Sequence, residues 1–453
     1  MLKALYYLLW DNPKAYNTVV NYTIQTSKYL LIGFTSVCTV TLVALFLLQR
    51  KLIYPSSFPQ GSRHEVMLPS AYGLSRFENE TLTTKDGVKI HIYLIKSNML
   101  NCKNTLLFFH ANAGNMGHRL PIVKCLFDQL HCNILMLSYR GYGKSLGSPS
   151  EHGIQADVDA LFEFALSNEY TKDTSFFCYG QSIGGAVAID TCYRYADSGR
   201  ISGLIVENTF LSLPLVATHL FPALSPFKFV VRDKWDSKSK IASLQDSLPI
   251  LFLSGKKDTL VPTSHMIKLA AIARAKRAEN LLNEKSNEET SSSKAETLKP
   301  ETSMPNTVHN VTFIQFHNGD HNTTCIQPGY FDSIFSWWSN FAYRRLNPLV
   351  LGIIIVDSQG LCLASWGSLK DQCSPTVISI IDHAEALLPN SISDDVIPYI
   401  KIETEAIKLV FKRHLDWSVA IALPKNAPVK VDFPDTSNNS NNEISFYSQD
   451  IHT

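Results

Sequence analysis

Three patterns of hydrophobic positions divide the chain. Residues 29–48 form one apolar run without a charge, residues 77–345 alternate short apolar runs with longer mixed stretches, and residues 347–425 contain a further set of apolar runs. An apolar run of about 20 residues crosses a bilayer core of roughly 30 Å. The first run therefore predicts a transmembrane helix over residues 29–48, preceded by a separate N-terminal segment, 1–28.

The long middle section predicts an α/β fold over residues 52–345. Two alternating runs around residues 85–87 indicate an antiparallel hairpin. Helical stretches such as 154–166 separate the later apolar runs, which are typical of buried parallel strands covered by helices on both faces. Active residues are expected at the carboxyl ends of these strands. The predicted strands are 105–110, 133–139, 175–179, 201–207, 249–254 and 311–316.

Two insertions interrupt the alternation. Residues 210–244 are aromatic and proline-rich and could cap a site as a small lid. Residues 279–309 are polar and charged without an aromatic side chain, which predicts a disordered insertion. Residues 347–425 predict a second, smaller α/β domain, a meander of strands with one helix over 375–388. The polar tail, 426–453, is expected to be disordered.

Composition narrows the possible functions. The 453 residues are 45% hydrophobic and 18% charged, which suits a globular enzyme of more than one domain. The net charge of +1 gives no basic surface for nucleic acid. The nine cysteines form no CxxC pair and are odd in number, which argues against a zinc site and a complete disulfide framework. No metal or other cofactor is expected.

The orientation of the predicted single span stays open. Basic residues are nearly balanced across it, with Lys14 and Lys28 before and Arg50, Lys51 and Arg63 after it. N-glycosylation triplets also occur on both sides, at Asn21 before the span and at Asn79, Asn310 and Asn322 after it.

The sequence GQSIGG carries the first chemical signal. An apolar strand ends in Gly180-x-Ser182-x-Gly184 and a small-residue helix follows, which predicts a sharp strand-to-helix turn that exposes the Ser182 hydroxyl. The N–H of Ile183 at the helix start is expected to face a developing oxyanion. A serine hydroxyl also needs a base and an orienting acid.

Both partners occur in the order Ser, Asp, His. Asp258 follows the strand 249–254, and His321 follows the strand 311–316. We predict Ser182 as nucleophile, His321 as general base and then acid, and Asp258 as the group that orients His321. Other candidates for these two roles lie nearby. They are Asp320 and Glu207 for the acid and His317 for the base.

The loop HANAGNMG after the first parallel strand is expected to supply the second oxyanion donor. Its small residues allow the backbone to approach a substrate carbonyl. We predict the N–H of Asn112, with Ala111 as the alternative. His110 and Arg140 are expected to brace loops.

The motifs HANAGN, SYRGYGKSLGSPSE, GQSIGG, ENTF, GKKDTLVP and GDHN together resemble the alpha/beta-hydrolase superfamily. The resemblance is strongest to the branch of alpha/beta-hydrolase domain-containing protein 13 and its budding-polarity relatives in fungi. It implies a type II membrane-anchored serine hydrolase, similar to acyl-protein thioesterases and depalmitoylases, with the triad on Ser182, Asp258 and His321. Two features depart from the family: Ala111 stands where glycine is usual, and the insertion separates acid from histidine.

The C-terminal domain resembles a different, non-enzymatic family. The motifs DSQGL and WGSL are similar to the fifth late endosomal/lysosomal adaptor subunit of Ragulator, a roadblock-like fold. That resemblance implies other Ragulator subunits as partners, a lysosomal or other endomembrane surface, and target-of-rapamycin signalling. Ragulator subunits assemble in the cytosol, whereas a type II hydrolase of this kind has its catalytic domain in the lumen. Both domains of this chain follow the single predicted span, so the two resemblances conflict. The anchor is inverted, the adaptor domain has lost its partners, or, as we favour, the chain joins two coding regions.

The leading hypothesis is a hydrolase of carboxylic esters or thioesters, with acyl lipids or palmitoylated proteins as substrates. The first alternative is an anchored adaptor with an idle hydrolase fold. The second is a serine peptidase on the same fold. A phosphate-loop enzyme is disfavoured because GQSIGG lacks the lysine of that motif.

Overall fold

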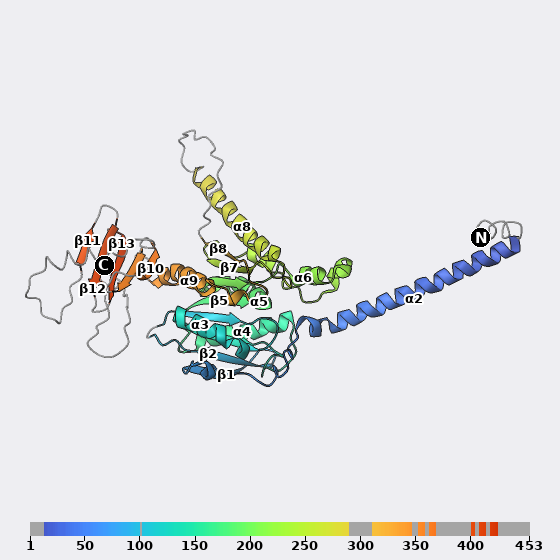
Figure 1. Cartoon of the computed structure of the whole chain (residues 1–453), viewed down its shortest axis with the longest axis horizontal. Coiled ribbons are helices and arrows are strands. Elements are labelled where there is room, and N and C mark those ends of the chain that lie inside the picture. The colour runs from blue at the N-terminus through green and yellow to red at the C-terminus, as the bar shows by residue number, and fades with distance from the viewer. Residues whose placement is uncertain are drawn as a thin grey trace, which may run out of the picture.

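The computed structural model describes residues 13–99, 102–289 and 310–346, and five strands within 352–424 (Figure 1). The predicted segment 1–28 is therefore described from residue 13 onward. The helix predicted over 375–388 and the tail 426–453 lie outside the described residues, as do 290–309 of the predicted insertion.

The helix α2, Pro13–Ile53, extends away from the rest of the chain (Figure 1). Among the described residues it is the one helix long and apolar enough to cross a membrane, and its apolar window is not buried by protein. It begins well before residue 29, where we expected the span to start. The reason is that neither glycine nor proline occurs between Lys14 and Ile32 to end the helix. Residues 29–48 are thus the apolar part of a longer helix.

An eight-stranded sheet forms the centre of the fold, in the order β1-β2-β4-β3-β5-β6-β7-β8. The hairpin β1–β2 and the pair β2–β4 are antiparallel, and the other pairs are parallel. This confirms the predicted mostly parallel sheet. The strands are β1 Phe77–Thr83, β2 Lys89–Ile95, β3 Asn104–Phe109, β4 Asn133–Ser138, β5 Ser175–Gln181, β6 Ile201–Glu207, β7 Ile250–Gly255 and β8 Val311–Phe316.

Helices cover both faces of this sheet, and each face has its own hydrophobic core. Because side chains alternate along a strand, Leu107 enters one core and Leu106 the other. The first core is completed by α4 Glu151–Ser167, α5 Ile183–Arg194, α7 Ser237–Ala242 and α8 Thr263–Glu289. The second is completed by α3 Leu120–Leu130 and α9 Tyr330–Leu346. The short helices are η1 Pro69–Tyr72, η2 Met116–Arg119, η3 Ala196–Ser198 and η5 Thr324–Ile326.

Helices occupy the first insertion and the beginning of the second. The first holds α6 Leu213–Leu220, η4 Pro222–Val230 and α7. For the second, the prediction of disorder from residue 279 onward is wrong as far as Glu289, because α8 continues to that residue. The helix continues because 279–289 contain good helix formers, such as leucine, glutamate and lysine, and neither glycine nor proline. Low hydrophobicity alone did not reveal this.

Five strands after α9 form a separate antiparallel sheet in the order β10-β9-β13-β12-β11. β9 and β10 pair as a hairpin, but β9 also pairs with β13, so the five strands do not form the simple meander predicted for this region. The bounds are β9 Gly352–Asp357, β10 Cys362–Gly367, β11 Ile400–Glu403, β12 Ile407–Arg413 and β13 Trp417–Pro424.

A buried hydrogen bond joins the residue after α2 to the domain built on the eight-stranded sheet. The indole Nε1 of Trp235 donates to the hydroxyl of Tyr54 over 2.9 Å, and both side chains are buried. The change Tyr54→Phe leaves that donor unpaired, so we expect it to lower the free energy of unfolding by about 1–3 kcal/mol. Denaturant unfolding in detergent measures the change. Tyr193→Phe, at an exposed tyrosine, is the control, and equal stability of the two variants would contradict the role given to this bond.

Candidate active site

Ser182 stands in a strained turn between β5 and α5. Its φ of 57° and ψ of −120° are a conformation that side chains rarely adopt. The turn requires close backbone packing, since a Cβ on Gly184 would lie 2.1 Å from the carbonyl oxygen of Phe109. The beginning of α5 is therefore held directly against the end of β3. This is the geometry expected of a nucleophile elbow.

The structure brings the three predicted side chains together. Ser182 Oγ lies 2.9 Å from His321 Nε2, and His321 Nδ1 lies 2.7 Å from Asp258 Oδ2. All three residues are buried, with exposed fractions of 6%, 9% and 7% in the order Ser182, His321 and Asp258. They come from loops after β5, β8 and β7, at the carboxyl edge of the sheet. A proton can pass from the hydroxyl to the imidazole without any side chain moving.

The other carboxylate oxygen of Asp258 is bound by its own loop. Asp258 Oδ1 accepts hydrogen bonds from the N–H groups of Leu260 and Val261, at 2.9 and 2.8 Å. These bonds fix the carboxylate so that its second oxygen faces the imidazole. The carboxylate is thereby held in position by backbone groups of its own loop.

The alternative acids occupy different environments. Glu207 is fully buried and accepts hydrogen bonds from the hydroxyls of Tyr179 and Tyr330, at 2.7 and 2.6 Å. Burial raises the pKa of its carboxyl. Asp320 is exposed and accepts from the backbone N–H groups of Asn322 and Thr323. Neither carboxylate bonds the His321 ring, whose Nδ1 faces Asp258.

The alternative base, His317, is exposed and points elsewhere. Its Nε2 lies 3.1 Å from Lys256 Nζ, away from Ser182. His110 is buried, its Nδ1 lies 2.7 Å from the carbonyl oxygen of Ala111, and burial lowers its pKa to about 3. A histidine that stays neutral and binds its own loop braces that loop, as predicted.

The candidate oxyanion donors lie on the two segments that Gly184 brings into contact. Ile183 begins α5, and Ala111 and Asn112 follow β3. In the part of the chain that the structure describes, no protein acceptor is assigned to the backbone N–H of any of the three. The Asn112 side chain is held on both sides: its amide donates to the carbonyl of Ile53, and its oxygen accepts from the Tyr142 hydroxyl at 2.9 Å.

Comparison with known proteins gives the family. Protein bem46 of Schizosaccharomyces pombe is 42% identical over 244 residues, which cover 53% of this chain and 80% of bem46. The chain belongs to the bem46 family of alpha/beta hydrolases. The uncharacterized membrane protein YNL320W of Saccharomyces cerevisiae is 33% identical over 310 residues, 68% of this chain and 95% of that protein. The alpha/beta hydrolase domain-containing protein WAV2 of Arabidopsis thaliana is 38% identical over 261 residues, 54% and 82% respectively.

Two family models match separate parts of this bem46-family chain. The alpha/beta hydrolase fold model matches residues 104–229, and the model of Ragulator complex protein LAMTOR5 matches residues 339–424. Among solved structures, the esterase Pf2001 of Pyrococcus furiosus has a TM-score of 0.45 and 16% identity, covering 60% of this chain and 94% of the esterase. Both predicted family resemblances are confirmed.

Arg140 braces the loop after β4 in this bem46-family chain. Its guanidinium binds Asp157 on α4 at 2.8 Å and Asp86 of the β1–β2 turn at 2.7 Å. The backbone N–H of Arg140 also donates to Asp157 over 2.8 Å. The predicted bracing role is confirmed.

Sequence reasoning missed two residues that connect the loops carrying Ser182, Asp258 and His321. Asn208, at a φ of 45°, accepts from the N–H of Gly255 and donates to the carbonyl of Asp320 and the hydroxyl of Thr324. The hydroxyl of Thr209 donates to the Ser182 carbonyl over 2.7 Å. Both belong to the motif ENTF, whose place directly after a strand was the available signal.

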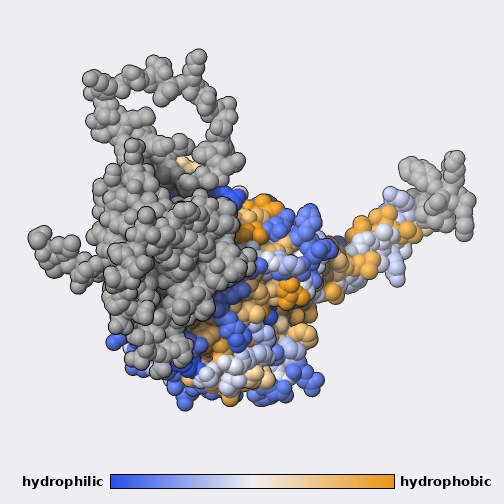
Figure 2. All heavy atoms as spheres, turned by 60° about the vertical axis from the view of Figure 1, so that its left-hand side comes forward, coloured by the Kyte–Doolittle hydropathy of each residue, from blue (hydrophilic) through white to orange (hydrophobic). Residues whose placement is uncertain are grey.

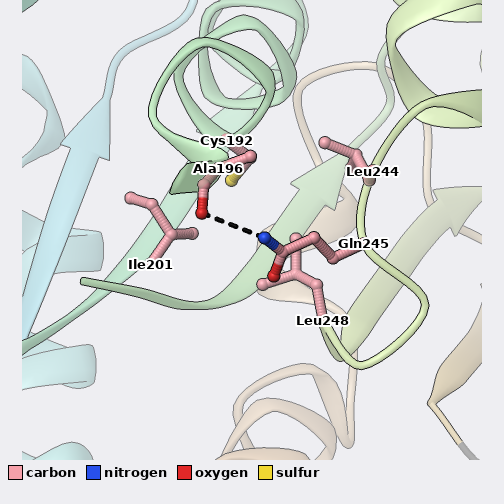
Figure 3. Close-up of a pocket in the computed structure, with 6 residues that line it drawn as sticks. All are labelled: Cys192, Ala196, Ile201, Leu244, Gln245 and Leu248. Carbon is pink, nitrogen blue, oxygen red and sulfur yellow. Dashed lines mark hydrogen bonds between the residues drawn. The ribbon is translucent and has the colours of Figure 1, made fainter. Parts of the chain in front are cut away.

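Other features of the described part do not add to this site. Figure 3 shows a pocket lined by Cys192, Ala196, Ile201, Leu244, Gln245 and Leu248. Ile201 begins β6 and Glu207 ends it, so the pocket lies about 20 Å from the edge that carries the triad. Within the described ranges, no group of three or more His, Cys, Asp or Glu residues is arranged to hold a metal ion.

Proposed function

We propose that this chain is a membrane-anchored serine hydrolase that cleaves carboxylic esters or thioesters. The observation that carries the proposal is the continuous contact from Ser182 Oγ to His321 Nε2 and from His321 Nδ1 to Asp258 Oδ2. A structural serine at a strand end has no need of a strained turn, a buried imidazole and an oriented carboxylate together.

In the proposed reaction, His321 Nε2 takes the proton of Ser182 while Oγ attacks the substrate carbonyl carbon. The tetrahedral intermediate collapses, and the protonated His321 gives its proton to the departing alcohol or thiol. Water then attacks the acyl-enzyme and loses a proton to His321, and this second tetrahedral intermediate collapses as the bond to Ser182 Oγ breaks. His321 returns the proton to Oγ, and the carboxylic acid is released. Asp258 stabilises the imidazolium and keeps the proton of the neutral ring on Nδ1.

The negative charge on the carbonyl oxygen requires two donors. We assign the N–H groups of Ile183 and Asn112, with Ala111 as the alternative to Asn112. Contact between the beginning of α5 and the end of β3 supports this assignment, because it brings the segment with Ile183 close to the loop with Ala111 and Asn112. Fixed donors of this kind contribute several kcal/mol to catalysis of acyl transfer.

The proposed substrates are acyl lipids or palmitoylated proteins, which reside at membranes. The α2 helix supports a single-pass anchor through residues 29–48. Type II orientation, with residues 52–345 as the catalytic domain, is part of the proposal. The peptidase alternative is less well supported, because exposed aromatic and aliphatic side chains on η4 and α6 suit an acyl chain better than a peptide.

Labelling with a fluorophosphonate tests the proposal. We expect wild-type protein to gain one adduct on Ser182 and Ser182→Ala to gain none, because the probe requires an activated serine. Ser239→Ala, which removes an exposed hydroxyl on α7, is the matched control and should label as the wild type does. Equal labelling of wild type and Ser182→Ala, detected by intact mass, would reject the assignment.

The C-terminal domain carries a second proposed function. The match of residues 339–424 to the Ragulator protein favours a binding role for the small sheet β9–β13. We propose that, where this domain keeps its partners, residues 347–425 bind subunits of a Ragulator-type assembly at an endomembrane or lysosomal surface. Both domains follow the one candidate span among the described residues, so such cytosolic binding requires the orientation opposite to type II. A complete triad disfavours the further idea that the hydrolase domain is only a scaffold for this adaptor.

A further inference from the structure

The membrane-proximal end of α2 is fastened to the insertion that follows β6. Gln49 donates from Nε2 to the carbonyl of Val230 over 3.3 Å, and its Oε1 accepts from the N–H of Arg232 at 2.7 Å. Arg50 pairs with Asp233 at 3.5 Å. The Arg232 guanidinium lies over the Phe46 ring, 5.3 Å from its centroid. The end of the apolar run and the end of η4 therefore lie at the same level.

The same end of α2 also contacts the catalytic loop. The side-chain amide of Asn112 donates to the carbonyl of Ile53, the last residue of α2. Asn112 follows β3 and lies on the loop that supplies the proposed second oxyanion donor. The active site is thus attached directly to the base of the anchor.

The insertion presents unpartnered apolar side chains on this side of the molecule, which we name the lid face. Its members lie on α6 and η4 and at the residue between them, and their exposed fractions run from 38% to 72%. They are Leu220, Phe221, Phe227 and Phe229. Hydrophobic side chains gather on the part of the surface from which α2 emerges (Figure 2). Clustered exposed phenylalanines are unfavourable in water and mark a contact surface.

The position of the anchor identifies what covers the lid face. If residues 29–48 occupy the bilayer core, Gln49 and Arg50 lie at the headgroups, three to four residues or about 5 Å beyond Phe46. Since Val230, Arg232 and Asp233 bind α2 at this depth, η4 must also lie at the membrane surface. Aromatic side chains favour this interfacial layer. The exposed Lys228 and Lys51 add positive charge that attracts lipid phosphates.

We propose that the lid face inserts into the interfacial layer of the same bilayer that holds α2. The acyl chain of a substrate then passes from that bilayer to Ser182 beneath the lid. This inference rests on the proposed anchor and deepens the proposed function, because it specifies esters and thioesters whose acyl chain is still in the membrane. Soluble esters would reach the site by another path.

Photocrosslinking of the full chain in phosphatidylcholine vesicles tests the contact without any measurement of activity. A benzophenone amino acid replaces Phe229 in one variant and Leu166 in the control. Leu166 is 41% exposed at the far end of α4, about 22 Å along the helix from Glu151, whose carboxylate binds the N–H of Trp235. Transfer of one phenylalanine side chain from water to lipid shifts the equilibrium toward the lipid-inserted state by at least about tenfold. We therefore expect at least about tenfold more phospholipid adducts at position 229 than at position 166. Equal adduct yields at the two positions would overturn the proposal.

Kinetics provides the second readout. Phe229→Asp should reduce hydrolysis of a bilayer-embedded long-chain ester at least about tenfold more than hydrolysis of a soluble butyrate ester, whereas Leu166→Asp should change neither. Equal loss on both esters would contradict membrane docking. If wild type hydrolyses neither ester, the proposed activity is rejected. The crosslinking experiment then still tests whether the lid face contacts the bilayer. Release of wild type from membranes by alkaline carbonate would refute the anchor and, with it, this inference.

Discussion

Asp258→Asn is expected to lower kcat by about four orders of magnitude while leaving the fold intact. The amide oxygen can replace Oδ1 and still accept from Leu260 and Val261, so the loop keeps its shape. The amide nitrogen then faces His321 Nδ1 as a donor, which forces the ring proton onto Nε2. An imidazole in that tautomer cannot accept the proton of Ser182. Steady-state hydrolysis of a soluble ester measures the loss.

Two matched variants distinguish the acid from its alternatives. Asp320→Asn alters an exposed turn and is expected to change kcat by less than about threefold. Glu207→Gln keeps an oxygen that can accept from the Tyr179 and Tyr330 hydroxyls. We therefore expect it to affect the stability of the core more than kcat. The assignment of Asp258 is wrong if either variant loses as much activity as Asp258→Asn.

Gly184→Ala is expected to destabilise the hydrolase domain by about 4 kcal/mol or more, or to prevent folding. The added Cβ would lie 2.1 Å from the carbonyl oxygen of Phe109 and 2.7 Å from that of His110. Both obstacles are backbone atoms of the sheet and its loop, which cannot rotate away. Relief requires α5 to separate from β3, and this exposes the core beneath the elbow. Denaturant unfolding monitored by tryptophan fluorescence measures the loss.

Gly199→Ala is the control for this change. A Cβ at Gly199 would meet no atom within 4 Å, although its φ of 66° is unfavourable for alanine. We expect a cost of about 1 kcal/mol from that backbone conformation alone. Equal denaturant midpoints for Gly184→Ala and Gly199→Ala would contradict the claim that Gly184 is required for close packing at the elbow.

Much of the fold followed from local pattern. The predicted strand 105–110 corresponds to β3, Asn104–Phe109, and 201–207 coincides with β6. Strands buried on both faces produce continuous apolar runs, and turns between them limit their lengths. The meeting of Ser182, Asp258 and His321 also followed from their order along the chain. Parallel strands place their carboxyl ends along one edge, so the fold dictates proximity even across a large sequence separation.

What the sequence did not reveal depends on three-dimensional contacts. The motif ENTF after a strand draws attention to Asn208, but nothing local shows that this side chain joins the Asp258 and His321 loops. The attachment of Asn112 to Ile53 likewise connects segments that no periodicity relates. The stretch that begins at residue 279 predicts disorder because it is polar and charged without an aromatic side chain, yet α8 continues through it to Glu289. Helix propensity acts locally and does not require burial.

The pairing of β7 with β8 has a consequence for how this protein can diverge. Gly255 lies opposite Phe316 in the register, so the loops that carry Asp258 and His321 leave the sheet from neighbouring positions. Residues 290–310 connect the end of α8 to the beginning of β8, which lies at the opposite edge of the sheet from these two loops. Insertions and deletions there can accumulate over evolutionary time without displacing Asp258 from His321. The chain can thus acquire new surface features in this stretch while its chemistry is inherited unchanged.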